Sequence, residues 1–343
     1  MTQTVLLGDI LVIRSGKSRP KESGKFPVYG GNGIFDSSNV TNIKNPAVIV
    51  GRVGAYCGSV YIERNPFWLS DNALGIETRE GVDLGYVYYL LKSLNLNSRS
   101  VGGAQPLMTQ SILKNISVSV PELDKQKKIA DILETIDEKI ELNRKMNETL
   151  EQMGQALFRH YFIDNPEAEK WGKAPVGAKI SPKRGKSLQS RNMVDGNVPV
   201  ISGGLQPAGA HNESNTKPPV VTISASGANA GFVSLWSRPV WSADSSYIDR
   251  SITEYVYTYY LFLRLKQKDI YGMQTGSGQP HVYPKHIELL EITDAPESVF
   301  LDFERKIEPL FEKNEDNNQE IQTLTILRDT LLPRLMNGKA KFK

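Results

Sequence analysis

The sequence predicts an α+β protein made of two copies of one unit, in which a β-rich globular part is followed by a long helix. Two observations support this prediction. Motifs of the first half recur in the same order in the second half at a nearly constant shift. Within each half, a strand-and-turn pattern changes once to a heptad-like helical pattern. The length of 343 residues agrees, because roughly 150 residues per domain suggests two domains.

The composition is that of an ordinary globular protein, with 39% hydrophobic and 23% charged residues. The single cysteine, Cys57, excludes an intramolecular disulfide and a thiolate metal cluster, and it favours a reducing compartment. The first residues lack the pattern of a signal peptide, and no apolar run reaches the roughly 18 residues of a membrane span. We therefore expect a cytoplasmic protein with no membrane partner and no metal site.

Six pairs of matching motifs define the repeat. The shift between partners grows only from 169 to 175 residues along the chain, which is close to half its length. Chance matches would not keep their order, so we interpret the halves as homologous with small loop insertions. The pairs are Gly16–Ser18 with Gly185–Ser187, Gly30-Gly31 with Gly203-Gly204, Gly54-Ala55 with Gly227-Ala228, Trp68 with Trp241, Gln105-Pro106 with Gln279-Pro280, and Pro121-Glu122 with Pro296-Glu297.

The first half is predicted to hold a globular part over residues 1–119, where short Val, Ile and Tyr runs alternate with Gly, Asn and Pro. A short helix is expected over residues 86–94. From 120 to 162 the turn residues almost disappear, and the spacing of the apolar residues predicts one long helix. Residues 163–176 are the predicted linker to the second half.

The second half repeats this change, with a globular part over 177–295 and a second long helix with a tail over 296–343. Pro309 and Pro333 are expected to kink or end the second helix, because proline lacks the N–H that a helix interior needs. Gly338 suits a helix C-terminus.

Each helix has an apolar stripe too narrow for a loop to bury, so each needs a partner helix. Pseudo-twofold symmetry between the halves would pack the two helices antiparallel, as a coiled coil. A helix of 30 residues spans about 45 Å, so we expect a dumbbell with the globular parts held apart. Asn143 aligns with Asn317 midway along the stripes. The two asparagines either face solvent or form a buried polar pair that fixes the register.

Charge is distributed unevenly between the segments. The globular parts carry net charges of +4 and +3, whereas 120–176 and 296–343 carry −3 and −1, which sum to the total of +3. Two basic lobes on a rod suit the grip of a DNA duplex, because phosphate neutralisation supplies affinity. Excesses this small are equally consistent with an ordinary surface.

Motifs for catalysis are incomplete. Gly16–Ser18 and its partner Gly185–Ser187 resemble the end of a phosphate-binding loop, but the required upstream glycine is replaced by Leu11 and Ile180. Asn65–Trp68 lacks the second proline of the motif with which amino-methyltransferases hold a flipped base. The histidines lack metal-ligand spacing, and Cys57 has no candidate partner. The sequence therefore argues against catalysis.

Gly-rich loops that carry polar or aromatic residues also recur. Glycine lets the backbone approach a ligand closely, and Arg, Asn, Gln and Ser pair with base edges in the major groove. Ordinary turns of a β-rich domain account for the glycines equally well. On the nucleic-acid hypothesis we predict contacts with bases or phosphates for Asn32, Arg52, Asn72 and Gln105 in the first half and Gln206, Asn229, Ser245 and Gln279 in the second, and with phosphates for Lys17, Arg19, Lys186 and Arg191.

The ordered, duplicated motifs resemble the specificity subunits of type I restriction-modification systems. The family pattern has a Gly-Asp start, a Pro-x-x-Gly-Gly loop, a Gly-x-x-Gly segment, a late Gly-x-x-Gln-Pro and a Pro-Glu boundary before a long helix. Here these are Gly8-Asp9, Pro27–Gly31, Gly51–Gly54, Gly102–Pro106 and Pro121-Glu122. The sequence departs from the family where a Glu-Gln pair follows the boundary: Lys125-Gln126 and Leu301-Asp302 stand there.

The resemblance implies two target recognition domains, over 1–119 and 177–295, that each read one half of a split sequence in double-stranded DNA. It implies that the helix pair sets the spacer and that this chain holds no cofactor. The partners implied are two methyltransferase subunits that bind S-adenosylmethionine, and restriction subunits that use ATP and Mg²⁺. The alternatives are a stand-alone DNA methyltransferase, which would bind S-adenosylmethionine itself, and an interaction scaffold that does not bind DNA.

Overall fold

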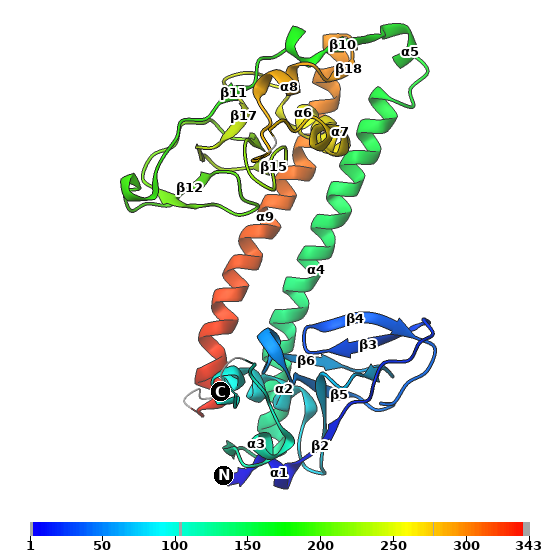
Figure 1. The fold of residues 1–343 in the computed structure, drawn as a ribbon, viewed down its shortest axis with the longest axis vertical. Coiled ribbons are helices and arrows are strands. Elements are labelled where there is room, and N and C mark those ends of the chain that lie inside the picture. The colour runs from blue at the N-terminus through cyan, green and yellow to red at the C-terminus, as the bar shows by residue number, and fades with distance from the viewer. Residues whose placement is uncertain (1–2, 103–104, 277, 339–343) are drawn as a thin grey trace. The chain divides into compact units, whose positions relative to one another are not determined.

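The computed structural model describes residues 3–102, 105–276 and 278–338. The chain divides into two compact units: unit 1 comprises residues 1–142 and 321–343, and unit 2 comprises residues 143–320. Two helices of 40 residues each, α4 (Leu123–Phe162) and α9 (Glu297–Met336), contribute one segment to each unit. Each unit therefore combines a β-rich part with two helical segments from distant parts of the chain (Figure 1).

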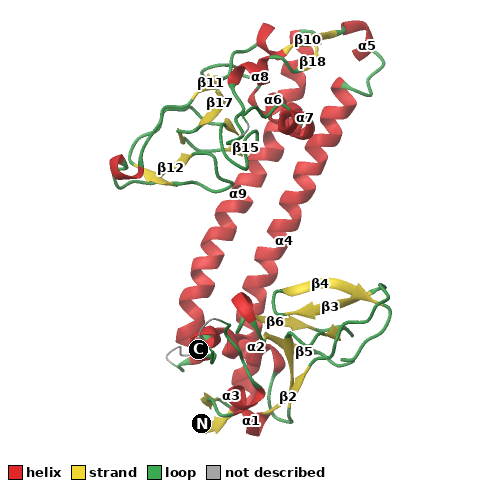
Figure 2. Cartoon of the chain, in the orientation of Figure 1, coloured by secondary structure: helices red, strands yellow, loops and turns green. Residues whose placement is uncertain are grey.

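Unit 1 has one larger and one smaller sheet (Figure 2). The larger is antiparallel, in the order β2 (Leu11–Ser15), β8 (Ala73–Thr78), β5 (Ala47–Gly51) and β6 (Val60–Glu63). The smaller has the order β4 (Gly33–Ser38), β3 (Phe26–Gly30) and β7 (Trp68–Leu69), with β3 and β7 parallel. A further pair joins β1 (Gln3–Leu6) to β9 (Ser117–Val120). The short helices are α1 (Leu7–Ile10), α2 (Leu84–Ser93) and α3 (Gln110–Lys114), with 3₁₀ turns at Gly54–Tyr56 and Leu96–Arg99.

Unit 2 repeats these sheets strand for strand. The larger has the order β11 (Lys183–Arg184), β17 (Ser245–Asp249), β14 (Val220–Ser224) and β15 (Val233–Trp236). The smaller has the order β13 (Gly209–His211), β12 (Val198–Ile201) and β16 (Trp241–Ser242), again with one parallel pair. β10 (Lys173–Pro175) pairs with β18 (Glu291–Thr293). The short helices are α5 (Ala168–Trp171), α6 (Val256–Leu265), α7 (Gln267–Gly272) and α8 (Pro284–Glu288), with 3₁₀ turns at Val176–Ala178 and Ser190–Asn192.

These elements confirm the predicted α+β class and the internal repeat. The helix expected over 86–94 is α2, and its counterpart in unit 2 is α6. The five-segment division of the chain stays a prediction, but β10 lies inside the segment predicted as a linker and is hydrogen-bonded into unit 2.

The core of each unit is completed by the long helices. In unit 1, Ile129 and Leu133 of α4 and Leu335 of α9 are buried in the cluster that contains Tyr86 of α2. In unit 2, the ring of Phe303 from α9 lies 5.9 Å and 5.2 Å from the rings of Phe158 and Phe162 of α4. Because burial of apolar area is the main favourable term in folding, the β-rich parts and the helices stabilise each other.

Within each unit the two helical segments run antiparallel, as predicted. In unit 2, Asn143 contacts Glu320 and Tyr161 contacts Asp302, so residue numbers rise along α4 as they fall along α9. In unit 1, Arg328 Nη1 of α9 lies 2.7 Å from Asp137 Oδ1 of α4.

Of the two outcomes expected for the prolines, a kink or an end of the second helix, the end is wrong, because α9 continues through Pro309 and Pro333 to Met336. Proline removes one helical N–H and favours a helical φ. Packing on both sides of Pro309, by Ile307 and Phe311 in the core of unit 2, offsets the lost hydrogen bond.

Asn143 and Asn317 are both fully buried, at 0% exposure. Asn143 Nδ2 donates to Glu320 Oε2 at 2.8 Å, and Asn317 Nδ2 donates to Asn147 Oδ1 at 2.8 Å. The Oδ1 atom of each buried asparagine has no hydrogen-bond partner among the described residues. The solvent-facing alternative is therefore wrong, and the two side chains are interior polar groups of the helix pair.

The repeated Gly-Lys-Ser motif has a packing role in both units. A Cβ at Gly16 would lie 1.9 Å from the carbonyl oxygen of Ser70, and one at Gly185 would lie 2.5 Å from that of Ala243. The next residue accepts a hydrogen bond from an indole: Trp68 Nε1 donates to the Lys17 carbonyl at 3.3 Å, and Trp241 Nε1 to that of Lys186 at 2.8 Å. The glycine is required because no side chain fits beneath the tryptophan strand.

We predict that Gly185→Ala lowers the free energy of unfolding by about 1–3 kcal/mol, because the added methyl group overlaps backbone oxygens. Urea unfolding followed by circular dichroism measures this. The matched control is Gly272→Ala, where no heavy atom lies within 4 Å of the new Cβ. Equal midpoints for the two variants would contradict the packing role.

We predict that the double substitution Asn143→Leu with Asn317→Leu raises the free energy of unfolding by about 1–3 kcal/mol, because it removes two buried acceptors that lack donors. Half-buried Asn147 can turn its amide to water. Chemical unfolding measures the change, and Asp316→Leu at an exposed position of α9 is the control. A less stable double variant would show that another group satisfies these oxygens.

Candidate nucleic-acid interface

Four loops of unit 1 meet at one edge of its β-rich part. We call them loop surface 1: residues 30–33, 52–56, 70–72 and 102–106. The backbone N–H of Arg52 donates to the Asn72 carbonyl at 2.9 Å, and that of Gly54 donates to the Pro106 carbonyl at 3.1 Å. A Cβ at Gly31 would lie 3.4 Å from the Asn72 carbonyl, which brings the first loop to the third. Gly103 and Ala104 lie outside the described residues.

Unit 2 builds the same surface from the corresponding loops. Loop surface 2 comprises residues 203–206, 226–229, 243–246 and 278–281; Ser277, in the last of the predicted loops, lies outside the described residues. The Ala225 N–H donates to the Asp244 carbonyl at 3.1 Å, and the Gly227 N–H donates to the Pro280 carbonyl at 3.0 Å.

Glycine is required at three matched positions in or directly beside these loops. All six residues have positive φ, between 73° and 103°, a conformation that side chains with a Cβ rarely adopt. The loop frames are therefore encoded by the repeated glycines, while the residues between them differ. The matched pairs are Gly54 with Gly227, Gly58 with Gly231, and Gly102 with Gly276.

Most of the predicted base-contacting residues lie on these two surfaces. Asn32, Asn72 and Gln105 of unit 1 and Gln206 and Gln279 of unit 2 are exposed. Two others are half-buried: Asn229, and Arg52, whose Nη1 donates to the Asp71 carbonyl at 3.3 Å. Their contact with DNA stays a prediction.

Ser245 is a correction. Its side chain is fully buried at 0% exposure, and its hydroxyl lies 2.8 Å from Ser242 Oγ and donates to the Ile201 carbonyl at 3.2 Å. Ser245 is the first residue of β17, where both it and Ser246 are buried, although its sequence counterpart Asn72 is exposed. We therefore remove Ser245 from the set of candidate DNA contacts.

The predicted phosphate contacts lie at exposed positions, namely Lys17, Arg19, Lys186 and Arg191. The guanidinium of Arg19 forms an ion pair with Asp36 of β4, which compensates part of its charge. The Lys17 N–H donates to the Leu69 carbonyl at 3.0 Å, and the Lys186 N–H donates to the Ser242 carbonyl at 2.9 Å. The backbones of the two lysines are therefore held at equivalent points of the two units.

Sequence reasoning missed a polar cluster on loop surface 2. Arg184 Nη2 of β11 lies 2.6 Å from Asp244 Oδ1, and the Ser226 hydroxyl donates to the other oxygen of that carboxylate. Asp244 matches Asp71 in the repeat, which was the available signal. Arg184 has no such signal, because Ser15 stands at its matching position.

Other features do not add chemistry to these surfaces. Burial raises the pKa of the Cys57 thiol, which is 1% exposed. Among the described residues, no group of three or more His, Cys, Asp or Glu is arranged to hold a metal ion. None of the described helices is both long and apolar enough to cross a membrane.

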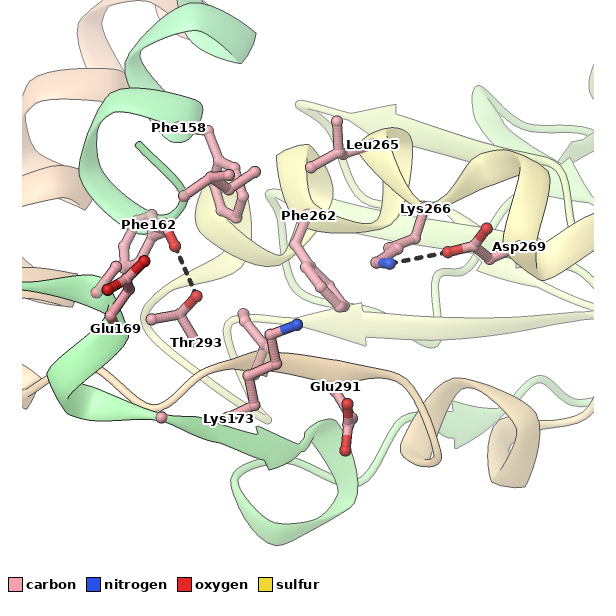
Figure 3. A pocket seen from close by; sticks show the side chains of 14 residues that line it. Phe158, Phe162, Glu169, Lys173, Phe262, Leu265, Lys266, Asp269, Glu291 and Thr293 are labelled. Atoms are coloured by element: carbon pink, nitrogen blue, oxygen red, sulfur yellow. Dashed lines mark hydrogen bonds and ion pairs between the residues drawn. The ribbon is translucent and has the colours of Figure 1, made fainter. Parts of the chain in front are cut away.

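A cavity of about 470 Å³ in unit 2 lies outside loop surface 2. Figure 3 shows its apolar wall, which includes Phe158, Phe262 and Leu265, and a rim where Lys266 pairs with Asp269 at 2.8 Å. The cavity thus has an apolar wall and a charged rim, which Glu169, Lys173 and Glu291 also line.

Comparison with known proteins shows which proteins the chain resembles. Residues 2–152 match a family model described as the type I restriction modification DNA specificity domain. The chain is 26% identical over 325 residues to the MjaIX type I restriction enzyme specificity subunit of Methanocaldococcus jannaschii, covering 83% of this chain and 75% of that one. It is 24% identical over 353 residues to a putative type I specificity subunit of Mycoplasma genitalium, covering 94% and 90%.

The fold agrees with these relatives. The crystal structure of a type I restriction-modification S subunit from Mycoplasma genitalium aligns with a TM-score of 0.74 at 20% identity, over 100% of this chain and 97% of the other. The duplicated sheets and the long helices thus have the fold of a type I S subunit, and residues 2–152 match the DNA specificity domain of type I restriction-modification systems.

Proposed function

We propose that this chain reads a bipartite target in double-stranded DNA, with loop surface 1 on one half-site and loop surface 2 on the other. The observation that carries this proposal is one loop frame with two sets of tips. Arg52 is matched by Ala225 and Asn32 by Leu205, whereas Gly54 and Gly31 in the same loops are matched by Gly227 and Gly204. Side chains that differ in hydrogen-bonding groups select different base edges, so two different half-sites follow.

Electrostatics supports DNA as the ligand. The globular segments carry +4 and +3, and each has an exposed lysine at the same point of the frame, Lys17 and Lys186. Phosphate contacts of this kind supply affinity without sequence preference and fix the position of the protein on the duplex. The loop tips then supply discrimination.

Specificity subunits are in general non-catalytic, and we propose the same for this chain. Two methyltransferase subunits would bring S-adenosylmethionine, and restriction subunits would bring ATP and Mg²⁺, in the cytoplasm. Equivalent apolar residues exposed on the helices support a pair of like partners: Met153 of α4 in unit 2 and Leu327 of α9 in unit 1 are 47% and 44% exposed. One partner subunit would contact Met153 and a second copy would contact Leu327, so both copies would use the same kind of apolar contact.

The experiment that tests this proposal exchanges residues 1–119 for those of a relative with another target. The chimaera and the parent are each expressed with methyltransferase subunits, and methylated sites are mapped by sequencing. We expect one half-site to change and the other to be retained. Two unchanged half-sites would overturn the proposal, and S-adenosylmethionine binding by the isolated chain would indicate a stand-alone methyltransferase instead.

We predict that Lys17→Ala and Lys186→Ala each weaken DNA binding about 3- to 10-fold on every sequence tested and reduce the slope of log affinity against log salt by about 1. Fluorescence anisotropy at several salt concentrations measures both quantities. Lys313→Ala on α9 is the control, at an exposed position outside the loop surfaces. A loss confined to one sequence would contradict the phosphate role.

A further inference from the structure

An arginine lies against the same repeated aspartate residue in both units. Asp71 and Asp244 occupy matching positions of the repeat. In unit 2, the guanidinium of Arg184 binds the Asp244 carboxylate at 2.6 Å. In unit 1, the guanidinium of Arg52 donates to the Asp71 backbone carbonyl at 3.3 Å.

The two arginines come from different places in the fold. Arg52 follows β5, and the residue that matches it in unit 2 is Ala225. Arg184 ends β11, and the residue that matches it in unit 1 is Ser15. A residue needed by the shared frame would keep its position in both halves, as Gly54 and Gly227 do. Both arginines bind the repeated aspartate but occupy different positions of the repeat. This indicates that they contact the ligand and are not part of the shared frame.

Asp244 is held from two sides. The Ser226 hydroxyl donates to one carboxylate oxygen, and Arg184 binds the other. The Asp244 carbonyl also accepts from the Ala225 N–H at 3.1 Å, so the residue directly before loop 226–229 is hydrogen-bonded to loop 243–246. Since the guanidinium is planar and rigid, one fixed nitrogen sets the direction of the others.

The charge of the cluster favours a base edge over a phosphate. A carboxylate directly beside the guanidinium repels a phosphate but leaves the remaining N–H donors of Arg184 available, and the side chain is 41% exposed. Among the described residues, Asp244 is the one side chain that the Arg184 guanidinium binds. An arginine fork of this kind matches O6 and N7 of guanine in the major groove.

We propose that Arg184, positioned by Asp244 and Ser226, donates two hydrogen bonds to O6 and N7 of one guanine in the half-site of unit 2, and that Arg52 does the same in unit 1. This inference rests on the proposed function and adds to it the two residues and the base that they read. Arg184 and Arg52 are the specificity-determining residues, and Asp244 and Ser226 are positioning residues.

The test places 7-deazaguanine, which lacks the N7 acceptor, at each guanine of the mapped target in turn. The probes are duplexes of that sequence, and the proteins are the full-length chain and its Arg184→Ala variant. We expect one position in one half-site at which the analogue weakens wild-type binding about tenfold, whereas binding by Arg184→Ala is already weak and falls no further. Substitutions in the other half-site should weaken both proteins equally.

Three further variants separate the roles. Arg184→Lys keeps the charge but not the fork, so it should lose the response to 7-deazaguanine. Asp244→Asn should reduce that response without removing it. Arg191→Ala, at an exposed predicted phosphate contact of the same unit, should weaken binding to all duplexes and keep the response. Equal unfolding midpoints verify that each variant is folded.

The outcome separates this inference from the proposed function. If the exchange of residues 1–119 moves one half-site but no guanine responds to Arg184→Ala, the arginine assignment is wrong and the proposed function stands. If the half-site read by unit 2 contains no guanine, the arginine assignment is likewise wrong and the proposed function stands. If the full-length chain binds all duplexes alike, the proposed function itself fails.

Discussion

The antiparallel packing of α4 against α9 is the constraint on which both units depend, because neither β-rich part completes its core alone. Unit 1 needs Leu335, more than two hundred residues away from the α2 residues that share its cluster, and unit 2 needs Phe158 and Phe303 from both helices. The burial of large apolar side chains contributes roughly 1.5–3 kcal/mol each. Each unit therefore folds around helical segments from distant parts of the chain. In unit 2, the buried Asn143 and Asn317 add hydrogen bonds between the two segments.

The loop surfaces are built on a frame that tolerates change. Glycines at positive φ and the backbone hydrogen bonds between loops use no side chain, so the residues at the tips are free to differ. Gly16 and Gly185 fix the positions of the two lysines in the same way. Each glycine lets the backbone pack closely against the strand that carries the tryptophan, and the lysine follows directly after it at an exposed position. The glycine of the motif that resembles a nucleotide-binding loop is thus explained by close packing. The lysine of this motif is explained by its exposed position directly after that glycine.

The sequence predicted what is repeated and missed what is not. Duplication, the strand-to-helix change and the antiparallel helices follow from periodic or recurring residues, and α2 begins two residues before its predicted start. Pro309 misled because tertiary packing outweighs the loss of one helical hydrogen bond. Ser245 misled because a residue matched to exposed Asn72 turns inward at the start of β17. Arg184 was invisible to a comparison of the halves, since only its partner Asp244 recurs.

The exception at Arg184 follows from the division between affinity and discrimination. Affinity for a polyanion needs charge at the right distance and little else, so Lys17 and Lys186 keep matched positions in both halves. Discrimination needs a hydrogen-bond donor that is held in a fixed direction toward one base edge. A neighbouring acceptor holds the donor in place, and when it is a carboxylate it also weakens the attraction of the donor for phosphates. Arg184 beside the Asp244 carboxylate meets this condition, and Arg52 on the Asp71 carbonyl meets it with a neutral acceptor. The two half-sites differ in sequence. The residues that read them therefore need not occupy matching positions in the two halves.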